Sequence, residues 1–262
     1  MKKKFSVFLK TNKYEIVTFL VDFATAFIAF KYFRNNLLIF LFAVVIFVLS
    51  FVLVIYLKTR DKDFFYLPLD SPGKEKDWVG RGVWKYVRSE ECFEITNSNV
   101  GFIFPKTILW DDYSFEFDFK IVNKTCAWIV RAINLSNYIM LQADFDGINP
   151  HIRLDGNWIV KKYSDADVNL GFNEKLAPDK WYKARVICEK RSIRITINDP
   201  KRPIFDRHWK IPDGFIVSYR EREDEDKVVN LYKEIDFDFG AIGFRNAGDE
   251  RGFIKYVYIQ RL

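Results

Sequence analysis

The sequence contains few of the residues that bind metals or form disulfides. Among its 262 residues are three cysteines and two histidines. Cys92, Cys126 and Cys188 show no Cys-x-x-Cys or Cys/His spacing, which argues against a zinc site. An odd count also argues against a disulfide framework, although one disulfide with one free thiol stays open. We therefore expect the three cysteines to be buried thiols. Glycine-rich phosphate loops are also missing, so we expect no cofactor.

The basic charge is concentrated near the N-terminus, although the whole chain carries a net charge of +6. Residues 1–60 contain nine basic and two acidic side chains. The remaining 32 of 41 basic and 33 of 35 acidic side chains give residues 61–262 a net charge of −1. Because domains that bind nucleic acid carry an excess of basic residues, we expect no nucleic-acid partner.

A long apolar run predicts a membrane anchor over residues 1–57. Residues 37–57 contain no charged side chain, and Lys58, Arg60 and Lys62 follow directly. A helix of this length extends about 31 Å, which matches the hydrocarbon core of a bilayer. We therefore expect a transmembrane helix over 37–57, a location at the cell membrane and lipid as a partner.

Residues 15–33 leave two arrangements open. They could form a second membrane helix, although Asp22 within lipid costs about 2.5–3.5 kcal/mol. A helical hairpin would place the later domain in the cytoplasm. An interfacial helix followed by a single span would export it to the extracytoplasmic side. Both arrangements satisfy the positive-inside rule, so the side of the membrane stays open.

After a charged linker over 58–77, residues 78–262 follow the two-residue period of β-strands. Residues 114–121 place Phe115, Phe117 and Phe119 on one face. Strands are also expected over 82–87, 91–96, 99–104, 125–133, 137–144, 150–154, 157–162, 181–189, 192–198, 214–219, 234–239, 240–246 and 253–259. No stretch after residue 60 has a helical period. The sequence thus predicts a mainly β fold, an antiparallel two-sheet sandwich.

Several segments, in order, resemble the concanavalin A-like jelly rolls, and most closely their laminin-G-like and 3-keto-disaccharide hydrolase-type members. These segments are DYSFEFDFKI (112–121), AWIVRAINLSNYIMLQ (127–142), RSIRITIND (191–199), GAIGFRN (240–246) and GFIKYVYIQ (252–260). The resemblance covers about 78–262 and implies a jelly-roll sandwich. Folds of this kind host lectins, hydrolases and adhesion modules alike.

The resemblance suggests a ligand-binding set formed by Trp128, Arg131, Asn137 and Tyr138, to which we add Arg245. Arg131 and Arg245 interrupt apolar strands, where an arginine needs a partner. They could hydrogen-bond sugar hydroxyls or a carboxylate, or form structural ion pairs. Aromatic rings could stack on sugars or fill the core; the candidates are Trp128, Tyr138, Trp158 and Trp209.

Two acidic segments are candidates for chemistry. Glu234, Asp236 and Asp238 alternate as in laminarinase-like glycoside hydrolases, where paired carboxylates act as nucleophile and acid. Such alternation is also typical of a solvent-facing strand, which is the interpretation that we favour. Residues 221–226 suggest calcium, but they lack the glycine and ligand spacing of a known calcium loop, so we expect a solvated loop.

The sequence therefore predicts a membrane-anchored β-sandwich module that binds a glycan or a protein partner without catalysis. One alternative is a glycan-degrading hydrolase of the 3-keto-disaccharide hydrolase type. Another is a structural subunit of a membrane complex, held to its partners through helices 15–33 and 37–57.

Overall fold

A computed structural model of the chain describes residues 48, 63–199, 202–211, 216–224, 227–234 and 237–262, with only the backbone described over 216–224 and 227–234. The chain divides into two compact units, Met1–Asp63 and Phe64–Leu262. Apart from Val48, the expected helices 15–33 and 37–57 lie outside the described residues. Within the described part, no helix has the length and apolarity needed to cross a membrane.

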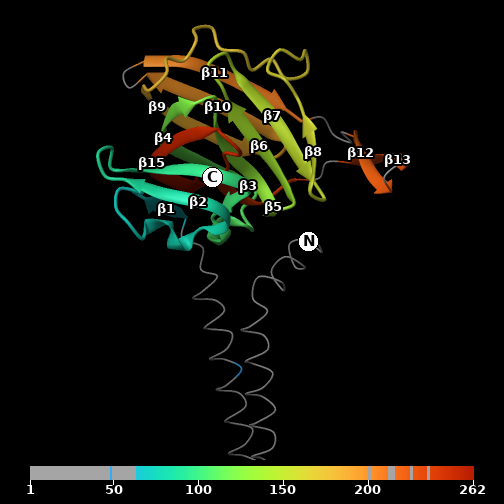
Figure 1. Cartoon of the computed structure of the whole chain (residues 1–262), viewed down its shortest axis with the longest axis horizontal. Helices are drawn as coiled ribbons and strands as arrows, with labels where there is room; N and C mark the ends of the chain where they lie inside the picture. Colours follow the sequence, from blue (N-terminus) through green and yellow to red (C-terminus); the bar gives the residue numbers. More distant parts are fainter. Residues whose placement is uncertain (1–47, 49–62, 200–201, 212–215, 225–226, 235–236) are drawn as a thin grey trace, which may run out of the picture. The chain divides into compact units, whose positions relative to one another are not determined.

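The unit Phe64–Leu262 is mainly β, as the sequence predicts (Figure 1). Two short 3-10 helices, η1 (Lys74–Asp77) and η2 (Pro105–Thr107), accompany the strands. The strands are β1 (Phe64–Leu67), β2 (Val79–Val87), β3 (Cys92–Ile103), β4 (Tyr113–Asn123), β5 (Cys126–Asn134), β6 (Asn137–Ala143), β7 (Ile148–Leu154), β8 (Asn157–Val160), β9 (Trp181–Glu189), β10 (Ser192–Asp199), β11 (Arg202–Lys210), β12 (Ile216–Asp224), β13 (Lys227–Glu234), β14 (Ala241–Phe244) and β15 (Arg251–Arg261).

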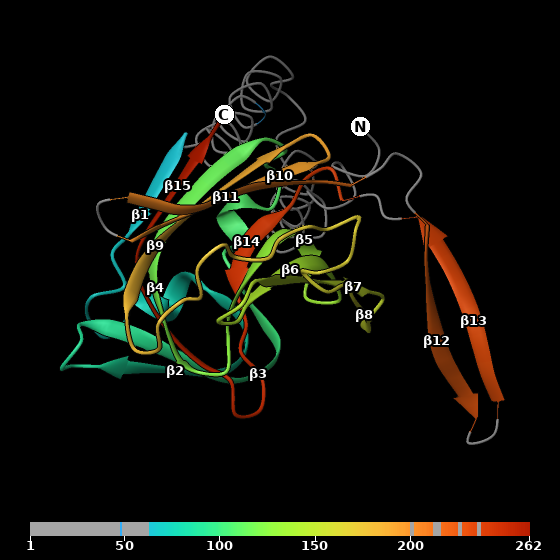
Figure 2. The ribbon, with the colours of Figure 1, turned by 90° about the horizontal axis from the view of Figure 1, so that it is seen from above.

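All but two of these strands form one curled antiparallel sheet, which Figures 1 and 2 show from two directions. Its order is β11-β10-β9-β4-β15-β3-β14-β5-β6-β7-β8, with β1 paired to β15 and β2 paired to β3. The hairpin of β12 and β13 forms a separate two-stranded sheet. Where the sequence predicts two sheets, the hydrogen bonds of the described residues follow one continuous path.

β3 makes this path continuous because it pairs with both halves of the sheet. Its first part, Phe93–Ile95, pairs with β15, and its last part, Phe102–Ile103, pairs with β14. Between them, Asn97 and Gly101 have φ values of 48° and 86°, in the left-handed region that turns the strand. A side chain at Gly101 would also collide with Ile129.

The two halves of the curled sheet pack face to face across an aromatic core. Phe117 of β4 lies 5.3 Å from Trp128 of β5 and 5.1 Å from Phe244 of β14, measured between ring centroids. β4 pairs with neither of these strands, so the contacts cross the core. The alternation predicted for 114–121 is confirmed, because Phe115, Phe117 and Phe119 are all buried. Burial of such rings is the main stabilising term of the fold.

Several predicted boundaries differ from the structure. The strands expected over 91–96 and 99–104 are one strand, β3, while β11 and β13 lie where none was expected. β1 and η1 fall inside the expected linker 58–77. The expected strand 234–239 is not formed where it is described, because β13 ends at Glu234 and residues 237–240 are irregular.

Candidate functional site

The tryptophan predicted to bind a ligand, Trp128, belongs to the core. Its side chain is fully buried, and its ring packs against Phe117 and Phe119, 5.3 and 5.7 Å away between centroids. A ring in this position has no face open to solvent on which a sugar could stack. The candidate site described below is therefore built on other residues.

Arg131 is also buried, and its guanidinium ties β5 to three irregular segments. It donates hydrogen bonds to the backbone carbonyl oxygens of Asp111, Lys190 and Asp238, with an Nη2–O distance of 2.8 Å to Lys190. Its charge lies 5.4 Å from the ring centroid of Tyr113. Arg131 also forms an ion pair with Asp112 at 3.8 Å. Arg131 therefore positions the backbone of these three segments against β5.

Asn137 and Tyr138 begin β6, but their side chains make different contacts. Asn137 holds two turns together: its Nδ2 donates to Asn134 Oδ1 at 3.2 Å, and its Oδ1 accepts from the backbone N–H of Asp155 at 3.1 Å. The Tyr138 hydroxyl donates to the carbonyl oxygen of Val100 at 2.8 Å. Its ring is buried at the base of the surface described next.

Tyr138, Arg153 and Trp158 form a row across β6, β7 and β8. The strand register places Tyr138 directly opposite Arg153 and Arg153 directly opposite Trp158. The Arg153 Cζ lies 5.9 Å from the Tyr138 ring centroid and 5.2 Å from that of Trp158. Directly opposed residues share one face of a sheet, so the three side chains project to the same side.

Arg245 reaches the same tryptophan from the end of β14. Its Cζ lies 4.5 Å from the Trp158 ring centroid, within cation–π range. The backbone around it is held firmly: its N–H donates to the carbonyl oxygen of Ala127 at 3.0 Å. The next residue, Asn246, accepts from the Ala127 N–H and donates to the carbonyl oxygen of Ile95.

The two arginines converge on one backbone oxygen. Arg153 Nη1 and Arg245 Nε donate to the carbonyl oxygen of Asn99, at 3.2 and 3.3 Å. His151, two residues before Arg153 on β7, places its ring 6.1 Å from Trp158. We call Tyr138, His151, Arg153, Trp158 and Arg245 together the Trp158 surface.

Three of the five side chains on the Trp158 surface are basic, and burial opposes the charge of two of them, His151 and Arg245. Burial, with the positive charge of Arg245, lowers the pKa of His151 to about 4. Burial also lowers the pKa of Arg245. Within the described part of the chain, neither Arg153 nor Arg245 forms an ion pair with a carboxylate, and the buried Nε of Arg153 has no hydrogen-bond partner. The described side chains of this surface therefore carry positive charge that no described carboxylate pairs with directly.

A small apolar cluster lies beneath the Trp158 surface, separate from the main core. Trp158 packs against it, and its buried members are Ile103, Ala127, Ile129, Ala132, Tyr138, Met140 and Ala241. These residues come from β3, β5, β6 and β14, so four strands support the surface. A surface placed on strands in this way is more rigid than one placed on loops.

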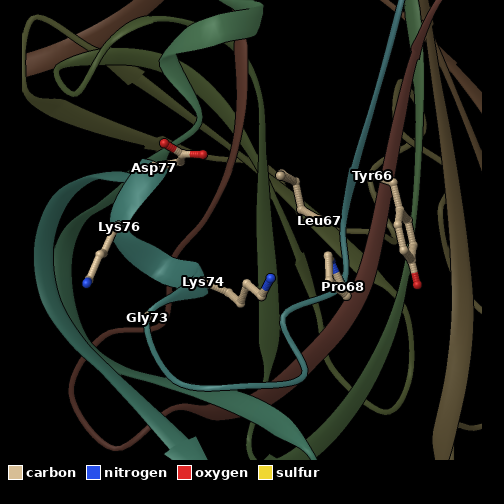
Figure 3. Close-up of a pocket in the computed structure, with 7 residues that line it drawn as sticks. All are labelled: Tyr66, Leu67, Pro68, Gly73, Lys74, Lys76 and Asp77. Atoms are coloured by element: carbon tan, nitrogen blue, oxygen red, sulfur yellow. The ribbon is translucent and has the colours of Figure 1, made fainter.

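A pocket of about 310 Å³ lies elsewhere, beside β1 and η1 (Figure 3). It is lined by Tyr66, Leu67, Pro68, Gly73, Lys74, Lys76 and Asp77. Lys74 extends toward Pro68, whereas Lys76 points away from it. Asp77 is paired with Lys106 at 3.0 Å. The lining contains no nucleophile with an adjacent base, so it offers no constellation for covalent catalysis.

Of the three acids predicted as catalytic candidates, Asp238 alone has a described side chain. Asp236 and the side chain of Glu234 lie outside the described part, so their roles stay predictions. Asp238 lies in an irregular segment, with its carboxylate 4.0 Å from Arg191. The side chains of the run 221–226, considered for calcium, are likewise outside it. Among the side chains that are described, no group of three His, Cys, Asp or Glu could hold a metal.

Sequence reasoning considered Trp158 as a stacking ring but missed Arg153 and His151. A signal was present. Asp155-Gly156 is a two-residue turn between strands, and such a turn places Arg153 opposite Trp158. His151 shares the face of Arg153 because it lies two residues away on the same strand.

Comparison with known proteins gives matches at the level of solved structures alone: no family model and no curated protein matches the chain. One similar structure is the carbohydrate-binding module CBM66 from Bacillus subtilis, which is 15% identical in sequence. The match covers 70% of this chain and 95% of that module, with a TM-score of 0.47. A protein of unknown function with a galectin-like fold from Bacillus subtilis has 16% identity, 75% and 94% coverage and a TM-score of 0.48. A putative glycosyl hydrolase from Parabacteroides distasonis ATCC 8503 has 16% identity, 76% and 100% coverage and a TM-score of 0.48.

Proposed function

We propose that this chain is a membrane-anchored β-domain that binds a glycan through the Trp158 surface and catalyses no reaction. The observation that carries the proposal is the row of Tyr138, Arg153 and Trp158, joined by Arg245. Sugar sites combine an aromatic ring, on which the apolar face of a sugar packs, with fixed hydrogen-bond donors for its oxygens. The Trp158 surface combines a half-buried tryptophan ring with the donors of two arginines, supported by four strands.

The finer fold belongs to the same proposal. The contacts of Phe117 with Trp128 and Phe244 across the core support a concanavalin A-like jelly roll, in which the two halves of the curled sheet act as two layers. In such a sandwich, one layer can present its outer face to a ligand while its inner face fills the core. The Trp158 surface would occupy that outer face.

Residues 1–57 would anchor the domain in the cell membrane. The support for this step is the uncharged run 37–57, followed by Lys58, Arg60 and Lys62. Anchoring raises the effective concentration of a binding module near ligands at the same membrane. Alkaline carbonate washing of membranes tests this step. We expect the chain to stay in the membrane pellet, and its release into the wash would refute the anchor.

Glycan binding is tested with the full chain in detergent on a glycan array. We expect Trp158→Ala to abolish the signal, because the substitution removes the ring on which both arginines pack. Trp181→Ala is the matched control. Trp181 is a half-buried tryptophan of β9 that also lies beside a basic side chain, with Lys255 Nζ 4.2 Å from its ring centroid. Retained binding in a folded Trp158→Ala protein would refute the proposed site.

A further inference from the structure

Within the described part of the domain, Arg153 and Arg245 differ from most other arginines because neither has an acidic partner there. Among the described residues, seven other arginines form ion pairs with a carboxylate. They are Arg131 with Asp112, Arg185 with Glu116, Arg191 with Asp238, Arg194 with Asp206, Arg202 with Glu174, Arg251 with Glu94 and Arg261 with Asp111. Among the described residues, carboxylates thus pair with these seven arginines and with neither Arg153 nor Arg245.

The nearby acid Glu250 is committed to other contacts. Its Oε1 accepts a hydrogen bond from Gln142 at 2.7 Å, and its Oε2 accepts from the backbone N–H of Ala247 at 2.8 Å. Glu250 acts on Arg245 through its charge alone. It thus stabilises the turn after Arg245 and leaves the guanidinium without an ion pair.

The fold holds the two guanidinium groups together despite their like charge. Both donate to the carbonyl oxygen of Asn99, and both lie over the Trp158 ring. Two like charges that are close together and partly removed from water are unfavourable unless an anion joins them. A guanidinium also presents its N–H donors in a planar fork that matches the two oxygens of a carboxylate or a sulfate.

We infer that the ligand of the Trp158 surface is an acidic saccharide, whose carboxylate or sulfate group binds between Arg153 and Arg245. This inference rests on the proposed function, since it names the class of glycan bound at the same surface. The sugar ring would pack beside Trp158, and its anionic group would take the place that a protein carboxylate occupies at the seven paired arginines.

The test compares saccharides that differ in the anionic group alone, with the full chain in detergent immobilised on a biosensor. The probes are hexagalacturonate and its methyl ester, 3′-sialyllactose and lactose, and a sulfated galactan oligosaccharide and its desulfated form. We expect at least one acidic form to bind about tenfold more tightly than its neutral partner, the effect of one additional charge-assisted contact. Three arginine-to-glutamine variants test whether the preference depends on the arginines of this surface. Arg153→Gln and Arg245→Gln should each remove most of the preference, whereas Arg194→Gln, at an exposed arginine of β10, should leave it unchanged.

The outcomes distinguish this inference from the proposed function. Equal binding of acidic and neutral forms, lost in Trp158→Ala, would overturn the inference and leave the proposed function standing. Equally tight binding of a single-stranded DNA oligonucleotide would also overturn it, because the surface would then select charge without selecting sugar. Absence of binding to every saccharide on the array would overturn both.

Discussion

Substitution of Arg131 by methionine tests whether this arginine supports the fold or binds a ligand. Methionine keeps much of the side-chain volume but removes the donors that reach the carbonyl oxygens of Asp111, Lys190 and Asp238. A hydrogen bond from a charged donor contributes about 1.5–3 kcal/mol, and removing one member of a buried charged network costs about 3–5 kcal/mol in total. We therefore expect Arg131→Met to lower the free energy of unfolding by about 3–5 kcal/mol.

The assay is urea unfolding of the full chain in detergent, followed by tryptophan fluorescence, beside glycan binding on the array. Arg131→Lys keeps the charge without the planar fork, so we expect a smaller loss of stability. Arg245→Gln is the converse control, with altered binding and a smaller loss of stability than Arg131→Met, because Arg245 is half-buried whereas Arg131 is buried. If Arg131→Met kept the native unfolding midpoint but lost glycan binding, Arg131 would belong to the ligand site, as the sequence suggests.

Two further predictions concern buried titratable groups. The pKa of His151 is about 4 in the folded chain against about 6.5 when unfolded, so stability should decline as the pH falls from 6.5 through 4. We expect the free energy of unfolding to fall by about 2–3 kcal/mol across this range. Urea unfolding at each pH measures it, and the contribution of this group should be absent in His151→Gln. Burial raises the pKa of Cys92 to about 12 and raises the pKa values of Cys126 and Cys188 as well. All three are free thiols, so a thiol reagent at pH 8 should label the native chain slowly and label three sites after unfolding; rapid labelling of the native chain would contradict this burial.

The strands that alternate in polarity could be predicted from the sequence because one face of each fills the core. In β4, Phe115, Phe117 and Phe119 are buried as the two-residue period requires. On the opposite face, Glu116 pairs with Arg185 of β9 at 3.2 Å. Local alternation contains no information on how far a strand continues, however. The sequence therefore predicts two strands, 91–96 and 99–104, where β3 turns at Asn97 without ending its pairing.

The role of the buried aromatic and basic residues could not be predicted from their position in a strand. Trp128 and Trp158 both lie on strands of the same half of the sheet, yet one faces the core and the other lies half-buried over the outer apolar cluster. Arg131 and Arg245 both interrupt apolar strands, yet one binds backbone carbonyls inside the molecule and the other stacks on Trp158. The difference depends on which elements pack against each face, and that is a property of the tertiary structure.

The Trp158 surface combines residues that are close in the sequence with residues that are far apart in it. The close ones could be predicted from the sequence, whereas the distant ones could not. Arg153 and Trp158 lie on β7 and β8, which a two-residue turn joins, so the turn alone sets the register that places them opposite each other. Arg245 reaches the same ring only because β14 lies between β3 and β5 in the curled sheet. Asn99, which accepts from both arginines, lies on β3, and β3 is also the strand that joins the two halves. The turn in β3 that makes the sheet continuous therefore also sets the spacing of the two guanidinium groups. A change that straightened β3, such as Gly101→Val, should weaken ligand binding together with stability, whereas a change confined to the β7–β8 turn should alter binding with a smaller effect on stability.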